Sequence, residues 1–172
     1  MVNEASINYN FLNVKETTPL DLSKLRGKGS HEKSASDPQA DYLLLVVDDS
    51  IDNLTVTSLY LQQNGYRVAT ATNGEEAVTV AALIKPDLIV MDLAMPGVDG
   101  LESTRQIRQN ESLKDIPVIA LTAFSTEGFR RAAHDTGFDG YLTKPVDFAR
   151  LDDLIGRLIG LARSARNRRS ES

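Results

Sequence analysis

The sequence contains no cysteine, which excludes disulfide bonds, thiolate catalysis and metal sites with cysteine ligands. No apolar run is long enough to span a bilayer, and the longest run near the first predicted strand is 42–47. The first residues lack a basic segment followed by an apolar stretch, so we expect no secretory signal and a cytoplasmic location. Neither a GxxxxGKS/T loop nor a GxGxxG turn is present after a strand, which argues against a nucleotide-binding enzyme.

Charge is distributed unevenly along the chain. Residues 1–40 carry five basic and five acidic side chains, whereas residues 41–160 carry ten basic and eighteen acidic ones, a net charge of −8. An acidic body argues against a nucleic-acid-binding domain, because neutralisation of phosphates needs a basic face. Residues 161–172 hold four arginines and Glu171, and we interpret 163–172 as a solvated basic tail. Contact of this tail with an acidic partner or nucleic acid is the alternative.

The hydrophobic pattern changes at about residue 41. Residues 1–40 show no sustained period of 2 or 3.6, and 27–40 is rich in glycine, serine and lysine, so we predict a flexible leader or linker. After it, short apolar runs alternate with helical periods, which indicates βα units and a parallel sheet buried on both faces. We therefore expect one folded domain over residues 41–162.

The alternation predicts five strands and five helices. The strands are expected near 42–47, 66–71, 87–91, 117–121 and 139–143. The helices are expected near 51–64, 74–84, 99–110, 125–136 and 147–162. Strict alternation gives a three-layer α/β sandwich, and right-handed crossovers favour a doubly wound sheet of order 2-1-3-4-5. Helix caps are expected at Ser125 and Asp147, and helix ends at Gly65 and Gly137.

Polar side chains stand where the predicted strands end. Asp48 and Asp49 follow the first strand, Asp92 the third, Thr122 the fourth and Lys144 the fifth. Because strand ends of one polarity lie on one edge of a parallel sheet, we expect these groups to form a single pocket. Two unit charges about 4 Å apart repel by about 4 kcal/mol at an effective dielectric constant near 20, so such a cluster either raises the pKa of a carboxyl group or binds a cation. Oxygen ligands without cysteine or a nearby histidine suit Mg²⁺ together with a phosphate.

The same side chains suit phosphoryl transfer. A central carboxylate can act as the nucleophile and form an aspartyl phosphate. The ammonium group of Lys144 can contact one phosphate oxygen, and the hydroxyl of Thr122 can donate to another. A cis bond between Lys144 and Pro145 would direct the ammonium inward, although most X-Pro bonds are trans.

Four segments resemble the signatures of response-regulator receiver domains. They are VVDDS at 46–50, MDLAMPGVDG at 91–100, ALTA at 120–123 and GYLTKP at 140–145, in order and at family-like spacing. The resemblance covers about residues 41–162 and implies a flavodoxin-like receiver fold.

The resemblance implies how the site would work. Asp92 would be the phosphoacceptor for a histidine kinase or a histidine phosphotransfer protein. Mg²⁺ would be held by the side chains of Asp48, Asp49 and Asp92 and by the backbone carbonyl of Ala94. Many family members carry a polar side chain where Ala94 stands, and likewise where Phe124 stands.

The resemblance also implies a route from the site to a partner. Thr122 and Lys144 would hold the phosphoryl group and couple it to the face formed by the fourth helix, the fifth strand and the fifth helix. Tyr141 and Pro145 would belong to the switch, with Tyr141 turning inward as Thr122 moves toward the phosphate.

We expect a phosphorylation-activated switch that signals by partner binding or by dimerisation, and not a conventional enzyme. Only about a dozen residues follow the last predicted helix, which favours a stand-alone receiver without a DNA-binding domain; a fragment of a hybrid kinase or of a larger regulator is the alternative. A receiver-shaped module that is never phosphorylated is a further alternative. So is an aspartyl-phosphate phosphohydrolase, but haloacid-dehalogenase-like enzymes usually carry a second aspartate where Ala94 stands. We interpret His31 and His134 as surface histidines, not phosphoryl relays.

Overall fold

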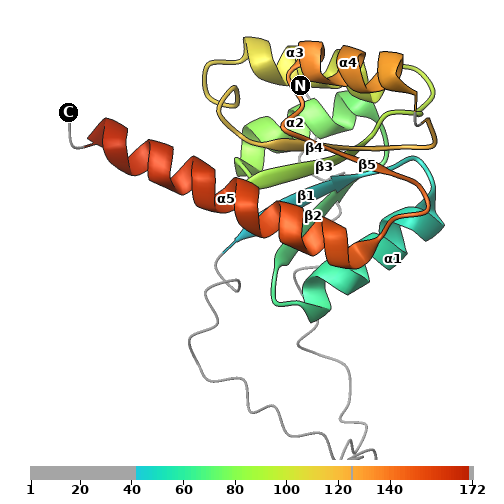
Figure 1. Cartoon of the computed structure of the whole chain (residues 1–172), viewed down its shortest axis with the longest axis horizontal. Coiled ribbons are helices and arrows are strands. Elements are labelled where there is room, and N and C mark those ends of the chain that lie inside the picture. The colour runs from blue at the N-terminus through green and yellow to red at the C-terminus, as the bar shows by residue number, and fades with distance from the viewer. Residues whose placement is uncertain (1–41, 125, 171–172) are drawn as a thin grey trace, which may run out of the picture. The chain divides into compact units, whose positions relative to one another are not determined.

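The computed structural model describes residues 42–124 and 126–170, which form a three-layer α/β sandwich (Figure 1). The sheet is parallel throughout, with strand order β2-β1-β3-β4-β5. The strands are β1 (Leu43–Val47), β2 (Arg67–Ala71), β3 (Leu88–Asp92), β4 (Val118–Thr122) and β5 (Gly140–Thr143). The helices are α1 (Ile51–Gln63), α2 (Gly74–Ile84), α3 (Gly100–Gln109), α4 (Glu127–Thr136) and α5 (Phe148–Ser170). The predicted fold class and strand order are confirmed, whereas the predicted leader, 1–40, lies outside the described residues.

Both faces of the sheet are buried, because successive strand residues point to opposite sides. In β1, Leu45 and Val47 pack in a core cluster with residues of α2, α3 and α4. Leu44 and Val46, from the same strand, pack in a second cluster with residues of α1 and α5. Figure 1 shows the same division, with α1 and α5 on one face of the sheet and the other three helices on the opposite face. This burial on both faces explains why the strands appear in the sequence as continuous apolar runs.

Local capping sets where the helices begin and end. The side chain of Asp99 accepts a hydrogen bond from the backbone N–H of Glu102 at 2.8 Å, so Asp99 caps α3. The predicted cap at Asp147 is confirmed, because its carboxylate accepts from the N–H of Arg150 at 3.2 Å. Gly137 ends α4 at φ 103°, a left-handed conformation that favours glycine. The other predicted cap, Ser125, lies outside the described residues, and α4 begins after Thr126.

Helix α5 is longer than the sequence pattern predicts. We expected it to end near residue 162, but it continues to Ser170 and its last turns extend beyond the sheet (Figure 1). Residues 163–170 include no glycine or proline, and four of them are arginines, which are strong helix formers. Arg163 also lies over the ring of Tyr42, 5.7 Å from its centroid, and Arg166 lies 3.7 Å from a carboxylate oxygen of Asp87.

Candidate functional site

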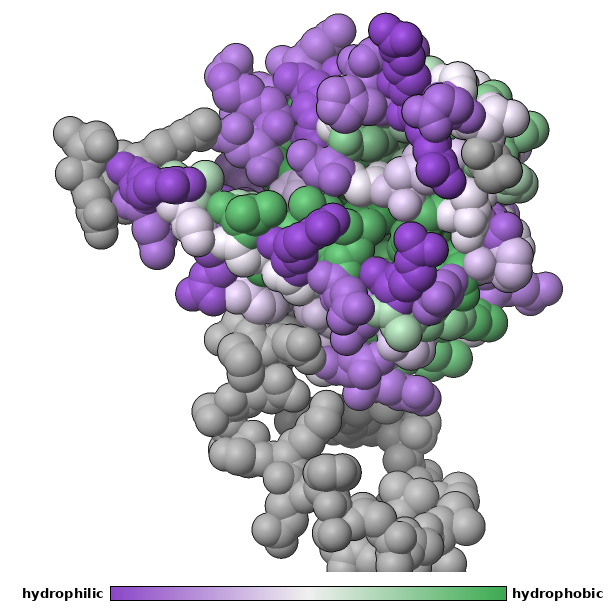
Figure 2. Space-filling view, viewed as in Figure 1, coloured by the Kyte–Doolittle hydropathy of each residue, from purple (hydrophilic) through white to green (hydrophobic). Residues whose placement is uncertain are grey.

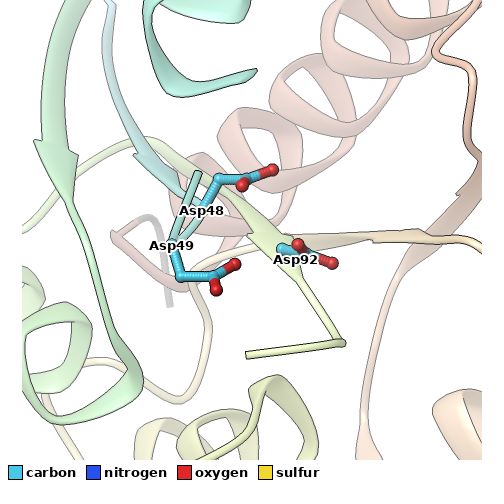
Figure 3. A group of neighbouring side chains, drawn as sticks. All are labelled: Asp48, Asp49 and Asp92. Atoms are coloured by element: carbon cyan, nitrogen blue, oxygen red, sulfur yellow. The ribbon is translucent and has the colours of Figure 1, made fainter. Parts of the chain in front are cut away.

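Three aspartates meet at the carboxyl ends of two neighbouring strands. Asp48 and Asp49 follow β1, and Asp92 is the last residue of β3, which pairs with β1. One carboxylate oxygen from each of the three lies within 4.8 Å of the others (Figure 3). This is the edge at which the strand order of the sheet reverses, and ligands of doubly wound folds bind there. The predicted convergence of the three carboxylates is therefore observed.

Two of these carboxylates are buried and held by hydrogen bonds, and the third is exposed. The side chains of Asp48 and Asp92 are each only 4% exposed, whereas Asp49 is exposed. Oδ1 of Asp48 accepts from the backbone N–H of Ser50 at 2.9 Å and from the side-chain amide of Asn53 at 3.3 Å. Oδ1 of Asp92 accepts from the backbone N–H of Ala94 at 3.0 Å. These bonds fix how the two buried carboxylates are oriented, and Asp49 faces the solvent side of the site.

Lys144 joins the two buried carboxylates. Its Nζ lies 2.8 Å from Oδ2 of Asp48 and 2.7 Å from Oδ2 of Asp92. The bond between Lys144 and Pro145 is cis. Burial lowers the pKa of Lys144, but the hydrogen bonds to Asp48 and Asp92 outweigh it, so the pKa is raised above its ordinary value of 10.5. The ammonium group is therefore charged at neutral pH and offsets part of the negative charge of the cluster.

Thr122 is fully buried at the end of β4, the strand next to β3. Its Oγ1 accepts a hydrogen bond from the backbone N–H of Phe124 at 3.0 Å, and its carbonyl oxygen accepts from the N–H of Lys144 at 2.7 Å. The hydroxyl of Tyr141, on β5, donates to the carbonyl oxygen of Phe124. The sequence patterns missed this bridging role of Phe124, because its hydrogen bonds to Thr122 and Tyr141 use only its backbone atoms.

The donors suit a hard divalent cation. The cluster offers carboxylate oxygens only, from Asp48, Asp49 and Asp92, and Ala94 follows in the loop directly after β3. Carboxylates with water and a phosphate oxygen are the usual ligands of Mg²⁺. The side chains present therefore fit the predicted magnesium ion, and Asp99, which caps α3, is not among them.

The loop between β3 and α3 is held in place by two close backbone contacts. A β-carbon added at Gly74, the first residue of α2, would overlap the carbonyl oxygen of Val98 and Oγ of Ser103. A β-carbon added at Gly100 would overlap the carbonyl oxygen of Asp92. Glycine is therefore required at both positions for the neighbouring backbone to approach closely.

Gly74→Ala is expected to lower the free energy of unfolding by about 1–2 kcal/mol, because the added methyl group must displace the backbone of Val98. Gly156→Ala is the matched control, since an added β-carbon there meets nothing within 4 Å. The free energy of unfolding of that control is expected to rise by up to about 1 kcal/mol, because alanine favours a helix more than glycine does. Urea titration of both variants measures the difference, and equal stabilisation of the two would contradict the close contact.

Comparison with known proteins identifies the family. The model of the response regulator receiver domain matches residues 44–156. The chain belongs to the response regulator receiver family. This receiver is 33% identical over 117 residues to the polar-differentiation response regulator DivK of Brucella anthropi, covering 68% of this chain and 95% of DivK. It is a signalling domain and not a conventional enzyme.

Relatives of this receiver also occur within larger proteins. It is 38% identical over 122 residues to the sensor histidine kinase GacS of Pseudomonas protegens, covering 69% of this chain but only 13% of that kinase. Two solved structures share its fold, each with a TM-score of 0.65 and each covered to 98%. One is chemotaxis protein CheY4 of Vibrio cholerae, which is 32% identical and matches 68% of this chain. The other is the receiver domain of histidine kinase PA1611 from Pseudomonas aeruginosa, 38% identical and matching 69%, which has a magnesium ion coordinated in its active site cleft.

Within the described part of this receiver, no helix combines the length and the apolar character needed to cross a membrane.

Proposed function

We propose that this receiver accepts a phosphoryl group on Asp92 from a phosphohistidine and then signals through α4, β5 and α5. The observation that carries the proposal is the convergence of three carboxylates and Lys144 at the carboxyl ends of the strands. Similarity to DivK, a response regulator, supports the switch role. The magnesium ion in the receiver of PA1611 supports the same ion here.

Asp92 is the nucleophile in this proposal. Its Oδ1 is engaged by the N–H of Ala94, whereas its Oδ2 faces Lys144, so Oδ2 attacks the phosphorus. The O–P bond forms as the P–N bond to the donor imidazole breaks. The bonding electron pair stays on the imidazole nitrogen, which takes a proton, and the phosphoryl group remains on Asp92.

The surrounding residues hold the transferred group. Asp48, Asp49 and Asp92, with the backbone carbonyl of Ala94, would bind Mg²⁺, which neutralises charge on the phosphoryl oxygens when it is bound. Lys144 transfers its hydrogen bond from the Asp92 carboxylate to a phosphoryl oxygen.

Thr122 connects the site to the output face. To donate its hydroxyl to a phosphoryl oxygen, Thr122 changes the position of Oγ1, which accepts from the N–H of Phe124 in the structure. Phe124 is stacked on Phe129 of α4, with ring centroids 4.6 Å apart, and its carbonyl accepts from Tyr141 of β5. A shift of the loop after β4 therefore reaches α4 and β5, and Tyr141 and Pro145 change position with it.

The partners follow from this mechanism. The phosphodonor is a histidine kinase or a histidine phosphotransfer protein, which membership of the receiver family implies. The signal passes to a downstream protein, or to a second copy of this chain, that docks on the face of α4, β5 and α5. Similarity to DivK over nearly its full length favours a single-domain regulator, and a part of a larger regulator is the alternative.

Incubation of the full chain with acetyl phosphate and Mg²⁺ tests the proposal. Intact-mass measurement is expected to show one added phosphoryl group, which is stable in acid and lost in base, as an acyl phosphate is. The same incubation with a chelator in place of Mg²⁺ is expected to give little addition, because three carboxylates then repel the donor. No added mass in either condition would favour a receiver-shaped module that is never phosphorylated.

A further inference from the structure

A groove runs between α4 and α5 along the edge strand β5. Its volume is about 540 Å³. Tyr141 and Leu154 line it as half-buried side chains, and Phe138 and Leu142 line it as buried ones. Figure 2 looks onto this face and shows a band of apolar surface between hydrophilic side chains above and below it. The groove thus offers an apolar floor with polar borders.

The borders of this groove are positively charged. Arg130 of α4 and Arg150 and Arg157 of α5 line it, and all three are exposed. Within the described residues, none of the three forms an ion pair. Arg130 instead lies over the ring of Tyr141, 5.8 Å from its centroid. We call this surface the arginine groove.

The acidic side chains of the arginine groove do not balance its arginines. Asp139 is already paired with Arg108, whose Nη2 lies 2.8 Å from its carboxylate. Asp153 is the other aspartate in the lining, and it forms no ion pair within the described residues. Three arginines thus oppose one uncompensated carboxylate, on a domain that is acidic elsewhere.

The arginine groove continues along the part of α5 beyond the family match. The match to the receiver family ends at residue 156, but α5 continues to Ser170. A second hollow of about 270 Å³ adjoins the first at Asp139, and Leu161 lines it with 62% of its surface exposed. From Arg150 to Leu161 the helix spans about 16 Å, the length of about three helical turns.

We infer that the arginine groove binds an acidic amphipathic helix of another protein. The apolar side of that helix lies on Tyr141, Leu154 and Leu161, and its glutamates and aspartates face the three arginines. Tyrosine and arginine side chains supply much of the binding energy in protein interfaces. The inference rests on the proposed function in one respect, since docking on this face is the output of the switch.

The charge of the groove disfavours a second copy as its occupant. In a two-fold dimer the same surface patch of both copies meets, so the three arginines of one chain would lie near those of the other. Placing like charges opposite one another across an interface weakens binding, because their repulsion opposes association. A partner of opposite charge removes this repulsion.

Fluorescence anisotropy with the full chain and a labelled helical peptide of about 15 residues tests the inference. The probe carries leucines along one side and glutamates on both flanks, and a control peptide has lysine in place of every glutamate. The glutamate peptide is expected to bind saturably and more weakly at high salt, whereas the lysine peptide is not expected to bind.

Charge reversal locates the binding surface. The double variant Arg150→Glu, Arg157→Glu is expected to weaken binding of the glutamate peptide by about tenfold or more. The matched control, Arg67→Glu with Arg131→Glu, changes the net charge equally at exposed positions outside the groove and is expected to change binding less than about twofold. Leu161→Ser is expected to weaken binding several-fold, whereas Leu83→Ser, at an exposed leucine of α2, leaves it unchanged.

Several results would overturn the inference. They are no saturable binding of the glutamate peptide, equal binding of the lysine peptide, or equal losses in the groove variant and its control. A dimer in sedimentation equilibrium that the groove variant abolishes would assign the face to a second copy instead. The measurements use the unphosphorylated chain, so a chain that binds the peptide but takes no phosphoryl group contradicts only the proposed function. A chain that is phosphorylated but does not bind the peptide contradicts only this inference.

Discussion

Asp92→Asn is expected to abolish phosphoryl addition to this receiver completely. The carboxamide of asparagine is not a nucleophile for phosphoryl transfer. In the proposed mechanism Asp48, the other buried carboxylate that contacts Lys144, binds Mg²⁺ and does not accept the phosphoryl group. Asparagine has nearly the same size, and Lys144 keeps its contact with Asp48 at 2.8 Å, so the fold is expected to remain. Intact-mass measurement after incubation with acetyl phosphate and Mg²⁺ gives the result.

Two controls separate the nucleophile from general loss of charge. Asp135→Asn removes one carboxylate from an exposed position on α4 and is expected to leave phosphoryl addition unchanged. Asp49→Asn removes a predicted metal ligand but keeps the nucleophile, so it is expected to slow the addition and to raise the Mg²⁺ concentration required. Undiminished addition in Asp92→Asn would mean that another residue carries the phosphoryl group.

Lys144→Met is expected to make the stability of the domain depend on Mg²⁺. Without the ammonium group, the buried carboxylates of Asp48 and Asp92 lose their common cation. The free energy of unfolding is then expected to fall by about 3 kcal/mol. This value is at the low end for a broken buried ion pair, because the lysine is partly exposed. Added Mg²⁺ is expected to recover most of this loss, since it neutralises the same carboxylates. Urea titrations with and without Mg²⁺ measure both effects.

The sign of the pH dependence follows from the raised pKa of Lys144. A group whose pKa is higher in the folded state stabilises the fold fully below its unfolded value, here 10.5, and the stabilisation is lost as the pH rises through the folded value. The difference between wild type and Lys144→Met is therefore expected to be constant around neutral pH and to shrink in strong base. Lys114→Met, which breaks an exposed ion pair with Glu111, is expected to lower the free energy of unfolding by less than about 1 kcal/mol with or without Mg²⁺. Equal losses in both lysine variants would contradict the buried contact.

The fold could be predicted from the sequence because each local signal agreed with the others. The apolar runs indicated strands buried on both faces, and residues such as Asp147 and Gly137 marked helix boundaries within about two residues. Strict alternation of strands and helices then left few topologies. The convergence of Asp48, Asp49 and Asp92 follows directly, because strand ends of one polarity share an edge.

Contacts between distant side chains could not be predicted in the same way. Arg108 donates to the carbonyl oxygens of Gly137 and Ile116 and to the carboxylate of Asp139, and no local pattern shows this arrangement. Burial of its guanidinium lowers the pKa of Arg108, although the carboxylate of Asp139 opposes that effect. The extension of α5 was missed for a different reason. An apolar stripe indicates only which residues of a helix pack against the domain. Whether the helix continues beyond the stripe depends on the helix propensity of the following residues, such as arginine and alanine.

Locating the phosphoryl group on the chain is the most direct test of the proposed mechanism. Reduction of the phosphorylated full chain with borohydride converts an aspartyl phosphate to homoserine, and peptide mass spectrometry then reads the modified position. The mechanism predicts homoserine at position 92 and nowhere else, because it assigns the nucleophile to Asp92 and gives Asp48, which is equally buried and also contacts Lys144, to metal binding alone. Homoserine at Asp48 or at Asp49 in place of Asp92 would contradict it.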